Sequence, residues 1–352
     1  MRRCKTAALA VPGDLATLTG GYRYDRRLLE ELRALGRDVT HVALGDSFPR
    51  PSPADMLDAG KRLAAVSADC PVIIDGLAMG AMDHSVLAKL SAPIVALVHH
   101  PLAQESGLDA ALRARLLRSE RDNLALAAHV IVTSTHTAAL LTSDYGVAPA
   151  RITVARPGSD GPKAPAAPAD PPLILSVGIQ IPRKGHDVLL RALANIADDA
   201  WQAIIVGSAR DAAHAELLGN LLTRLGLSRR VRLAGEVTPE ELAQLYGQAT
   251  LFALATRYEG YGIVFDEAMT HGLPIVSCAV GAVPLTVAPG AGQLVPPDDP
   301  RAFAAALARV LKDAGARSAM AAAAAAAGSE LPGWDGTAGV VAAVLDRVVA
   351  GV

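Results

Sequence analysis

Short apolar runs alternate with amphipathic stretches along the whole chain. Several of the runs are apolar on both faces, as parallel strands covered by helices on each side are. In the first half they are TAALAVP (6–12), DVTHVAL (38–44), PVIIDG (71–76), PIVALVHH (93–100), HVIVTS (129–134) and ITVARPG (152–158). Helical stretches such as RRLLEELRALG (26–36), which ends at a glycine, lie between them. This alternation predicts an α/β protein with a doubly wound parallel sheet.

The pattern is interrupted once and then restarts. GPKAPAAPADPP (161–172) is rich in proline and alanine, so it predicts a linker rather than a strand or helix. The later apolar runs are LILSVG (173–178), WQAIIVG (201–207), VRLAGEV (231–237), TLFALAT (250–256) and PIVSCAV (274–280). The alanine-rich tract 320–327 predicts a helix, LPGWDG ends it, and residues 337–349 form a last amphipathic helix. We expect two Rossmann-like domains, residues 1–160 and 173–333, followed by a C-terminal helix in residues 334–352.

Composition and charge narrow the classes of function. A length of 352 residues suits roughly two domains, and a net charge of −2 gives no indication of nucleic-acid binding. The three cysteines, Cys4, Cys70 and Cys278, are too far apart in sequence to indicate a disulfide framework or a metal cluster, which favours a cytoplasmic setting. The basic and apolar start is too short for a signal peptide, so we expect a buried strand there. No apolar stretch is long enough to predict a transmembrane helix.

The segment TRYEGYGIVFDEAMTHGLPIVSCAVG (256–281) is the most informative part of the chain. A strand ends near Thr256, a glycine-containing loop follows, and a helix runs from about Gly262 to Gly272. Ligands of parallel α/β sheets bind at the carboxyl ends of strands. The unpaired N–H groups at a helix start suit a diphosphate, and Gly260 and Gly262 allow the backbone to approach it closely. The segment therefore predicts a site for a phosphorylated ligand.

Two carboxylates flank the start of this predicted helix. Glu259 lies on the loop, and Glu267 lies about one turn into the helix, where a carboxylate can accept hydrogen bonds from ribose hydroxyls. Taken singly, either residue reads as a helix cap or a solvated side chain. The whole loop–helix–strand string favours function.

These strings resemble a known family. EGYGIVFDE followed by AMTHGLPIVS resembles the E-x7-E motif of retaining GT-B glycosyltransferases, especially glycosyltransferase family 4. The resemblance extends through SVGIQIPRKGHDVLLRAL, VRLAGEVTPEELAQLYGQATLFALAT and VPPDDPRAFAAAL, and more loosely through TGGYRY, HVIVTS and ITVARPGSD. It implies a GT-B fold, in which two Rossmann-like domains face a cleft. The first domain would bind the acceptor, the second would bind the nucleotide sugar, and the C-terminal helix would return to the first.

The resemblance also implies residue roles in the second domain. Glu267 would bind the ribose hydroxyls, and Glu259 would contact the transferred sugar. Lys184 would neutralise the diphosphate, whose charge grows in the transition state. The sugar and phosphates would lie near the backbone groups of Tyr261, Gly262, Ile263 and Val264. The nucleobase would lie beside the backbone of Glu236 and Val237.

In the first domain, the backbone amides of Gly20 and Gly21 would contact phosphate or sugar. Either His99 or His100 would contact the donor sugar. Successive strand residues point to opposite faces, so we expect one histidine in the site rather than both. The alternative is one buried structural histidine and one solvated neighbour.

The chain departs from the family pattern at two positions. Many members have an arginine where Ile179 stands, and Arg183 is the candidate for the missing second cation. Asp266 beside Glu267 is also unusual for the family.

The function implied is retaining, metal-independent transfer of a hexose from a nucleotide-diphosphate sugar to an acceptor hydroxyl, with no cofactor. UDP-hexose and GDP-mannose are the first donors to try. A cell-envelope glycan, a glycolipid and a small metabolite all stay open as acceptors. A non-catalytic nucleotide-sugar-binding partner subunit and a GT-B sugar-nucleotide epimerase are the alternatives. A nicotinamide dehydrogenase is disfavoured because PGDLATLTGG, with no G-x-G-x-x-G, follows the first strand.

The arginine-rich helix LRARLLRSER (112–121) bears on localisation. Such a run is most often an ordinary solvated helix face. A basic amphipathic helix can also contact anionic lipid, so weak peripheral contact with the inner face of the cell membrane stays open.

Overall fold

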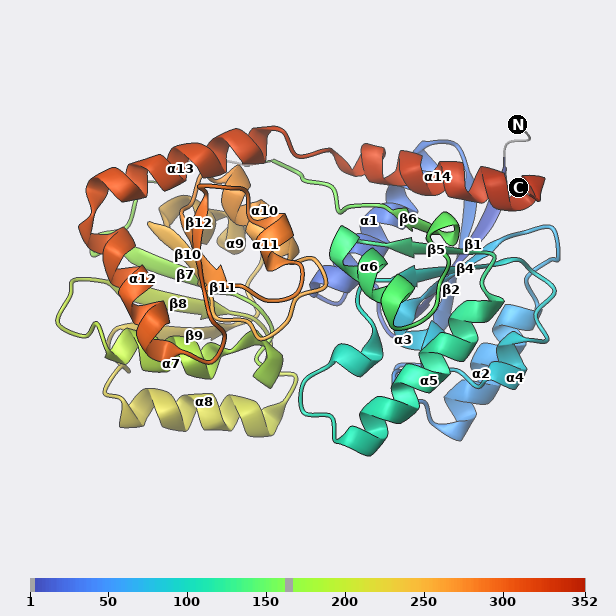
Figure 1. The fold of residues 1–352 in the computed structure, drawn as a ribbon, viewed down its shortest axis with the longest axis horizontal. Helices are drawn as coiled ribbons and strands as arrows, with labels where there is room; N and C mark the ends of the chain where they lie inside the picture. Colours follow the sequence, from blue (N-terminus) through green and yellow to red (C-terminus); the bar gives the residue numbers. More distant parts are fainter. Residues whose placement is uncertain (1–3, 162–166, 352) are drawn as a thin grey trace. The chain divides into compact units, whose positions relative to one another are not determined.

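The computed structural model describes residues 4–161 and 167–351. The chain divides into two compact units, each traced in Figure 1. The first unit consists of Met1–Gly158 and Pro332–Val352, and the second of Ser159–Leu331. Part of the predicted linker 161–172, residues 162–166, lies outside the described residues.

The first unit is built on a parallel sheet of six strands in the order β2-β1-β3-β4-β5-β6. The central strands β3, β4 and β5 are buried at every residue, which explains their continuous apolar sequences. The strands are β1 Thr6–Pro12, β2 Asp38–Leu44, β3 Val72–Asp75, β4 Ile94–Val98, β5 His129–Val132 and β6 Ile152–Val154. The helices are α1 Gly20–Ala34, α2 Pro53–Ala64, α3 Gly76–Met79, α4 His84–Leu87, η1 Leu102–Gln104, α5 Ala110–Leu126, α6 Thr135–Ser143, η2 Pro149–Arg151 and α14 Trp334–Ala350.

The second unit repeats this plan with the strand order β12-β11-β10-β7-β8-β9, again parallel throughout. Its strands are β7 Leu173–Val177, β8 Gln202–Val206, β9 Val231–Gly235, β10 Leu251–Leu254, β11 Ile275–Cys278 and β12 Gly292–Val295. Its helices are η3 Pro182–Lys184, α7 His186–Ala194, α8 Ala212–Arg224, α9 Pro239–Gln248, α10 Ile263–Thr270, α11 Val283–Thr286, α12 Pro300–Lys312 and α13 Ala314–Ser329. The predicted α/β fold with two Rossmann-like parallel sheets is confirmed.

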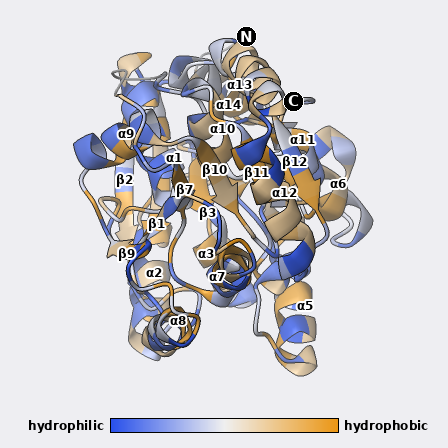
Figure 2. Ribbon diagram, turned by 90° about the vertical axis from the view of Figure 1, so that its left-hand side faces the viewer, coloured by the Kyte–Doolittle hydropathy of each residue, from blue (hydrophilic) through white to orange (hydrophobic). Residues whose placement is uncertain are grey.

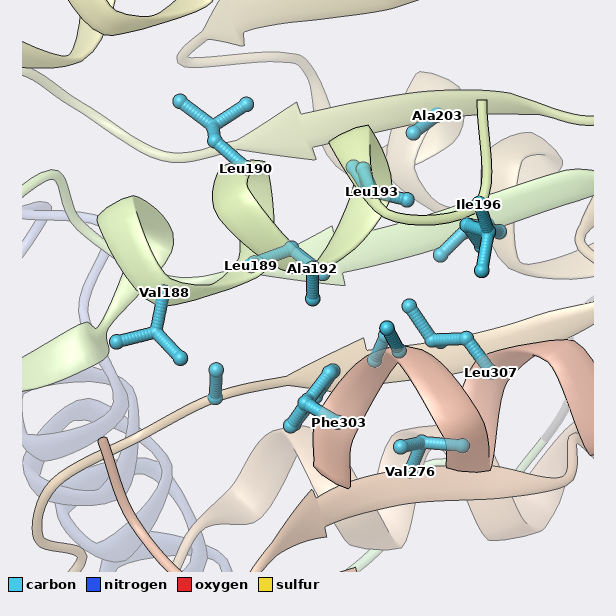
Figure 3. Packing of buried hydrophobic residues seen from close by; sticks show 14 of the residues in the cluster. Val188, Leu189, Leu190, Ala192, Leu193, Ile196, Ala203, Val276, Phe303 and Leu307 are labelled. Atoms are coloured by element: carbon cyan, nitrogen blue, oxygen red, sulfur yellow. The ribbon is translucent and has the colours of Figure 1, made fainter. Parts of the chain in front are cut away.

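The core on one face of the second sheet shows how apolar spacing holds helices to strands. Leu189 and Leu193 of α7 lie one helical turn apart and are fully buried with Phe303 and Leu307 of α12 (Figure 3). Burying a side chain of this size stabilises the fold by about 1.5–3 kcal/mol. Such packing fixes α7, and with it the β7–α7 loop that begins the candidate site.

Three elements, α1, α14 and β12, differ in part from the sequence predictions. Helix α1 begins at Gly20 rather than near residue 26, because its first turn is polar and shows no apolar periodicity. Helix α14 begins at Trp334, within the predicted C-terminal helix segment 334–352 and three residues before the predicted amphipathic stretch 337–349. Strand β12 was not predicted, since Gly292 and Gln293 leave it only two apolar residues.

Helix α14 belongs to the first unit, where it packs against α1. Its Thr337 hydroxyl donates to the Arg156 carbonyl at 2.7 Å, and Asp346 forms an ion pair with the buried Arg37 at 2.8 Å. Helix α5 carries both hydrophilic and hydrophobic residues along its length, as the colours in Figure 2 show. In the part of the chain that the structure describes, no helix combines the length and apolarity that crossing a membrane requires.

Candidate functional site

A buried carboxylate lies on the loop that follows β10. Glu259 is only 5% exposed, and its Oε1 accepts hydrogen bonds from Lys184 Nζ at 2.7 Å and Thr256 Oγ1 at 3.0 Å. Its other oxygen, Oε2, lies 3.8 Å from Nη1 of Arg183. Burial alone would raise the pKa of Glu259, but Lys184 and Arg183 outweigh it and hold that pKa below its ordinary value. Glu259 is therefore an anion held between two cations.

The β7–α7 loop brings these two cations to Glu259. Gly185 ends the short helix η3 with φ +63°, and a Cβ there would lie 1.9 Å from the Ala255 carbonyl oxygen. Only glycine allows this approach, which seats η3 against the end of β10. Further contacts join the two loops, since the Arg183 carbonyl lies 3.1 Å from Thr256 Oγ1 and Arg183 Nη1 donates to the Tyr258 carbonyl at 3.0 Å. These contacts join the two loops into one platform.

Helix α10 starts beside this platform. Its N-terminal cap, Gly262, has φ +92°, and a Cβ there would lie 2.6 Å from the Phe265 ring. Another glycine, Gly281, has φ +53° and lets the segment after β11 pass the Glu259 carbonyl, where a Cβ would approach within 2.4 Å. The half-buried Ile263 and Val264 begin the helix, whose N-terminus carries a partial positive charge.

Glu267 lies one turn along α10 and is held from a different helix. The buried Tyr246 of α9 donates its hydroxyl to Oε2 of Glu267 at 2.7 Å. The Tyr246 ring stacks on the His271 ring with centroids 5.0 Å apart, and His271 Nδ1 donates to the Glu267 carbonyl at 2.8 Å. Tyr246 was not predicted as part of the site; the available signal was a tyrosine next to Leu245 in a predicted helix, since a buried tyrosine hydroxyl usually finds a partner.

Asp266, the residue unusual for the family, points into the unit rather than toward Glu267's partners. The Tyr261 hydroxyl donates to Asp266 Oδ2 at 2.6 Å, and both residues are buried. Thr286 Oγ1 donates to the Tyr261 carbonyl at 2.8 Å. Asp266 therefore fixes the loop that precedes α10.

The remaining residues predicted for this site follow other strands of the sheet. Ile179 is half-buried just after β7, and Gly178 beside it packs against the Lys184 stem, where a Cβ would lie 3.2 Å from Lys184 Cδ. Glu236 is exposed and Val237 half-buried on the connection from β9 to α9. All of these connections leave the carboxyl edge of one parallel sheet, where its ligands are expected.

A second cluster lies in the first unit, at the ends of β3 and β4. His99 Nε2 lies 3.0 Å from Asp25 Oδ1 and 3.5 Å from Asp75 Oδ2, and both aspartates are 2% exposed. The Tyr24 ring packs edge-on against the His99 ring at 5.1 Å. A Cβ on Gly21 would lie 3.5 Å from His99 Cδ2, so the first turn of α1 packs against the imidazole.

Burial and charge raise the proton affinity of this cluster. Burial and the neighbouring Asp25 raise the pKa of Asp75 from 3.8 to about 7. Burial lowers the pKa of His99, but Asp25 and Asp75 outweigh it and raise that pKa overall. The ligand atoms of these three residues lie within 4.8 Å of one another, and of the described residues they form the group with the spacing to hold a metal ion. The hydrogen bond between His99 and Asp25 already accounts for the close approach of these groups.

The two neighbouring histidines have different partners. His100 Nε2 lies 3.3 Å from Glu105 Oε2, and both His99 and His100 are half-buried. Gly20 and Gly21 begin α1. The structure thus groups Gly21 with His99 in the first unit, and Arg183, Lys184 and Glu259 in the second.

This fold is that of the GT-B glycosyltransferases. Sucrose-phosphate synthase from Thermosynechococcus elongatus has a TM-score of 0.85 at 23% identity, covering 99% of this chain and 100% of that one. Anabaena Alr3699/HepE in complex with UDP and glucose has a TM-score of 0.78 at 19% identity, covering 97% of this chain and 99% of that one.

The sequence identifies the family. The model described as "Glycosyl transferases group 1" matches residues 160–327, and "Glycosyltransferase Family 4" matches residues 18–160. Together the two models cover residues 18–327, and the chain belongs to the glycosyltransferases that they describe. Among its relatives, D-inositol 3-phosphate glycosyltransferase of Kineococcus radiotolerans is 34% identical over 234 residues, which is 58% of this chain and 54% of that protein. That of Thermobifida fusca is 32% identical over 253 residues, 66% and 58% of the two chains. The chain thus spans little more than half the length of these relatives.

Proposed function

We propose that this protein is a retaining glycosyltransferase that moves a hexose from a nucleoside-diphosphate sugar to an acceptor hydroxyl. The observation that carries the proposal is the arrangement at the carboxyl edge of the second sheet. Glu259 is paired with Lys184 there, and Glu267 is held by Tyr246 one turn into α10. Membership of the family supports the class of reaction. The complexes of Anabaena Alr3699/HepE with UDP and with UDP-glucose support a nucleotide-sugar donor.

Each part of the arrangement has a task in donor binding. The Glu267 carboxylate accepts hydrogen bonds from the ribose hydroxyls, and the backbone near Glu236 and Val237 borders the base. The α10 N-terminus and Lys184 receive the diphosphate. Glu259 contacts hydroxyls of the transferred sugar. In the first unit, His99 and the amides of Gly20 and Gly21 are the groups we assign to sugar or phosphate oxygens.

The reaction exchanges one bond at the anomeric carbon. The bond from that carbon to the diphosphate oxygen breaks, and the electron pair leaves with the nucleoside diphosphate. The acceptor oxygen forms the new bond on the same face, and its proton passes to the leaving diphosphate, which gives retention. Lys184 and the α10 N-terminus stabilise the growing negative charge, so this route needs no metal ion.

The relatives suggest the first acceptor to try. D-inositol 3-phosphate glycosyltransferases, by name, act on a phosphorylated polyol. Glycan, glycolipid and small-metabolite acceptors belong in the same screen. Helix α5 exposes Arg113, Arg115, Arg118 and Arg121, which supports including lipid-linked acceptors and anionic vesicles.

The test is turnover of UDP-, GDP- and ADP-sugars with this acceptor panel. We expect acceptor-dependent release of the nucleoside diphosphate and a glycoside whose anomeric configuration, read by NMR, matches that of the donor. An inverted product would contradict retention. Donor isomerisation without an acceptor would favour an epimerase. Nucleotide binding without any turnover would favour a non-catalytic partner subunit.

A further inference from the structure

Lys184 is assigned two partners in the proposed donor site, the Glu259 carboxylate and the donor diphosphate. Its Nζ is 2.7 Å from Oε1 of the buried Glu259, yet the same ammonium group is assigned to the donor diphosphate. An ammonium has three protons and can donate to more than one oxygen, but a diphosphate competes strongly for its charge. Ile179 is apolar and half-buried, so it supplies no charge to either group.

Arg183 approaches Glu259 from the other oxygen. Its Nη1 lies 3.8 Å from Oε2 of Glu259 and donates to the Tyr258 carbonyl at 3.0 Å. The side chains of Arg183 and Glu259 are 10% and 6% exposed, so this contact is shielded from water. The two oxygens of Glu259 therefore face two different cations.

Because the two cations lie at different oxygens, Glu259 keeps one of them when Lys184 moves to a bound diphosphate. A buried carboxylate that loses all its cations is strongly destabilised, because neither water nor protein compensates its charge. Glu259 retains Arg183 and the Thr256 hydroxyl, which donates to Oε1 at 3.0 Å. The carboxylate can then stay ionised and in place.

We propose that Arg183 is a positioning residue that holds Glu259 while Lys184 exchanges this carboxylate for the donor diphosphate. Arg183 thus compensates indirectly for the missing cation at position 179, where Ile179 stands. It frees Lys184 to bind the diphosphate and does not contact the diphosphate itself. The inference rests on the proposed function, since it requires a diphosphate at Lys184.

A double-mutant cycle separates the two roles of Arg183. Binding of UDP, GDP and ADP is measured by calorimetry for the wild type, Arg183→Gln, Glu259→Gln and the double variant. Nucleoside diphosphates lack the sugar, so the contact of Glu259 with sugar does not enter. We expect Arg183→Gln to weaken binding by about 10- to 100-fold, because Lys184 stays committed to Glu259. The Glu259→Gln variant should bind the nucleotides as tightly as the wild type or more tightly. The double variant should bind them within about threefold of the affinity of the Glu259→Gln variant.

Equal losses from Arg183→Gln in both backgrounds would overturn the inference, because they would show direct contact with the diphosphate. No loss from Arg183→Gln in the wild type, where Glu259 is intact, would overturn it as well. A wild type that binds none of the three nucleotides would instead contradict the proposed function. A wild type that binds while the cycle is additive contradicts the inference alone.

Two further variants guard against a folding artefact. Arg183→Lys keeps the charge and should retain most of the binding; if it binds as weakly as Arg183→Gln, charge is not the cause. Arg257 offers a matched control, since it pairs with Asp187 at 2.9 Å and Asp298 at 2.7 Å from the same loop. Arg257→Gln should show no coupling to Glu259→Gln. Thermal unfolding without nucleotide checks that each variant is folded.

Discussion

The two units place carboxylates in similar positions and give them opposite electrostatics. In the second unit, Lys184 and Arg183 surround Glu259 and lower its pKa. In the first unit, Asp75 faces another carboxylate, Asp25, and its pKa rises to about 7. Both lie where parallel strands end. The difference shows that the ends of parallel strands place carboxylates at one edge of each sheet. The neighbouring side chains then decide the protonation state: cations keep Glu259 ionised, whereas a second carboxylate favours the protonated form of Asp75.

The largest effect should come from removing the cation of the second unit. Lys184→Met should lower the transfer rate on the order of 10²–10³-fold, because the leaving diphosphate loses charge stabilisation. Steady-state kinetics with the best donor measures this effect. Lys312→Met is the matched control, since Lys312 is 64% exposed and pairs with Asp199 away from the site. A rate for Lys184→Met close to that of the control would remove Lys184 from the mechanism.

The proton-holding cluster predicts a pH dependence with a definite sign. Asp75 has a raised pKa in the folded state, so its contribution to stability is complete below its ordinary value of 3.8 and is lost as pH rises through about 7. His99, whose pKa is also raised, acts in the same direction. Over this window one proton corresponds to about 1.4 kcal/mol per pH unit.

Asp75→Asn should therefore flatten the fall in melting temperature between pH 5 and pH 8. Glu120, a buried carboxyl of the same unit with a pKa raised to about 7, will keep part of the slope. Asp14→Asn changes an exposed carboxylate and should leave the profile as it is. A slope that is unchanged in Asp75→Asn would mean that burial and Asp25 do not raise the pKa of Asp75 in the folded protein.

A smaller effect should follow from removing one hydroxyl group. Tyr246→Phe leaves the ring stacking in place but removes the hydrogen bond to Glu267, so nucleotide affinity should fall by about 10-fold. The matched variant in the first unit is Tyr145→Phe, since the Tyr145 hydroxyl donates to Glu120 at 3.4 Å. Calorimetry should show unchanged affinity there. Equal losses in both variants would indicate a general effect on folding.

The smallest effects should come from helix caps, one in each unit. Ser134 accepts from the Thr137 amide at 3.0 Å at the start of α6, and Thr238 accepts from the Glu241 amide at 3.2 Å at the start of α9. Replacing either by alanine should cost about 1 kcal/mol of unfolding free energy. Thermal unfolding of both variants with saturating nucleotide should show stabilisation of the second unit, which contains Thr238. Stabilisation of the first unit alone, which contains Ser134, would contradict a nucleotide site in the second unit.

Much of the fold was predictable because it depends on local patterns. Long apolar runs identified eleven of the strands, whereas β12, with Gly292 and Gln293 in it, carries too weak a pattern. The E-x7-E string located Glu259 and Glu267 because loop and helix are continuous in sequence. Tyr246 escaped, since its contact with Glu267 spans 21 residues and depends on how α9 packs beside α10.

The first unit was harder to predict for a related reason. The expected start of its first helix at residue 26 left Asp25 outside, so nothing indicated that this aspartate is buried against His99. A buried carboxylate on a helix has no sequence signature of its own. Its role becomes visible only when β3 and β4 bring Asp75 and His99 beside α1.

Nucleotide binding, measured by thermal shift on the wild type and on Glu267→Ala, tests the central claim most directly. We predict that at least one of UDP, GDP and ADP stabilises the wild type, by about 2.7 kcal/mol at a hundredfold excess over its dissociation constant. The same nucleotide should give little or no shift in Glu267→Ala. Absence of a shift with every nucleotide, or an equal shift in the variant, would contradict a donor site built on Glu267.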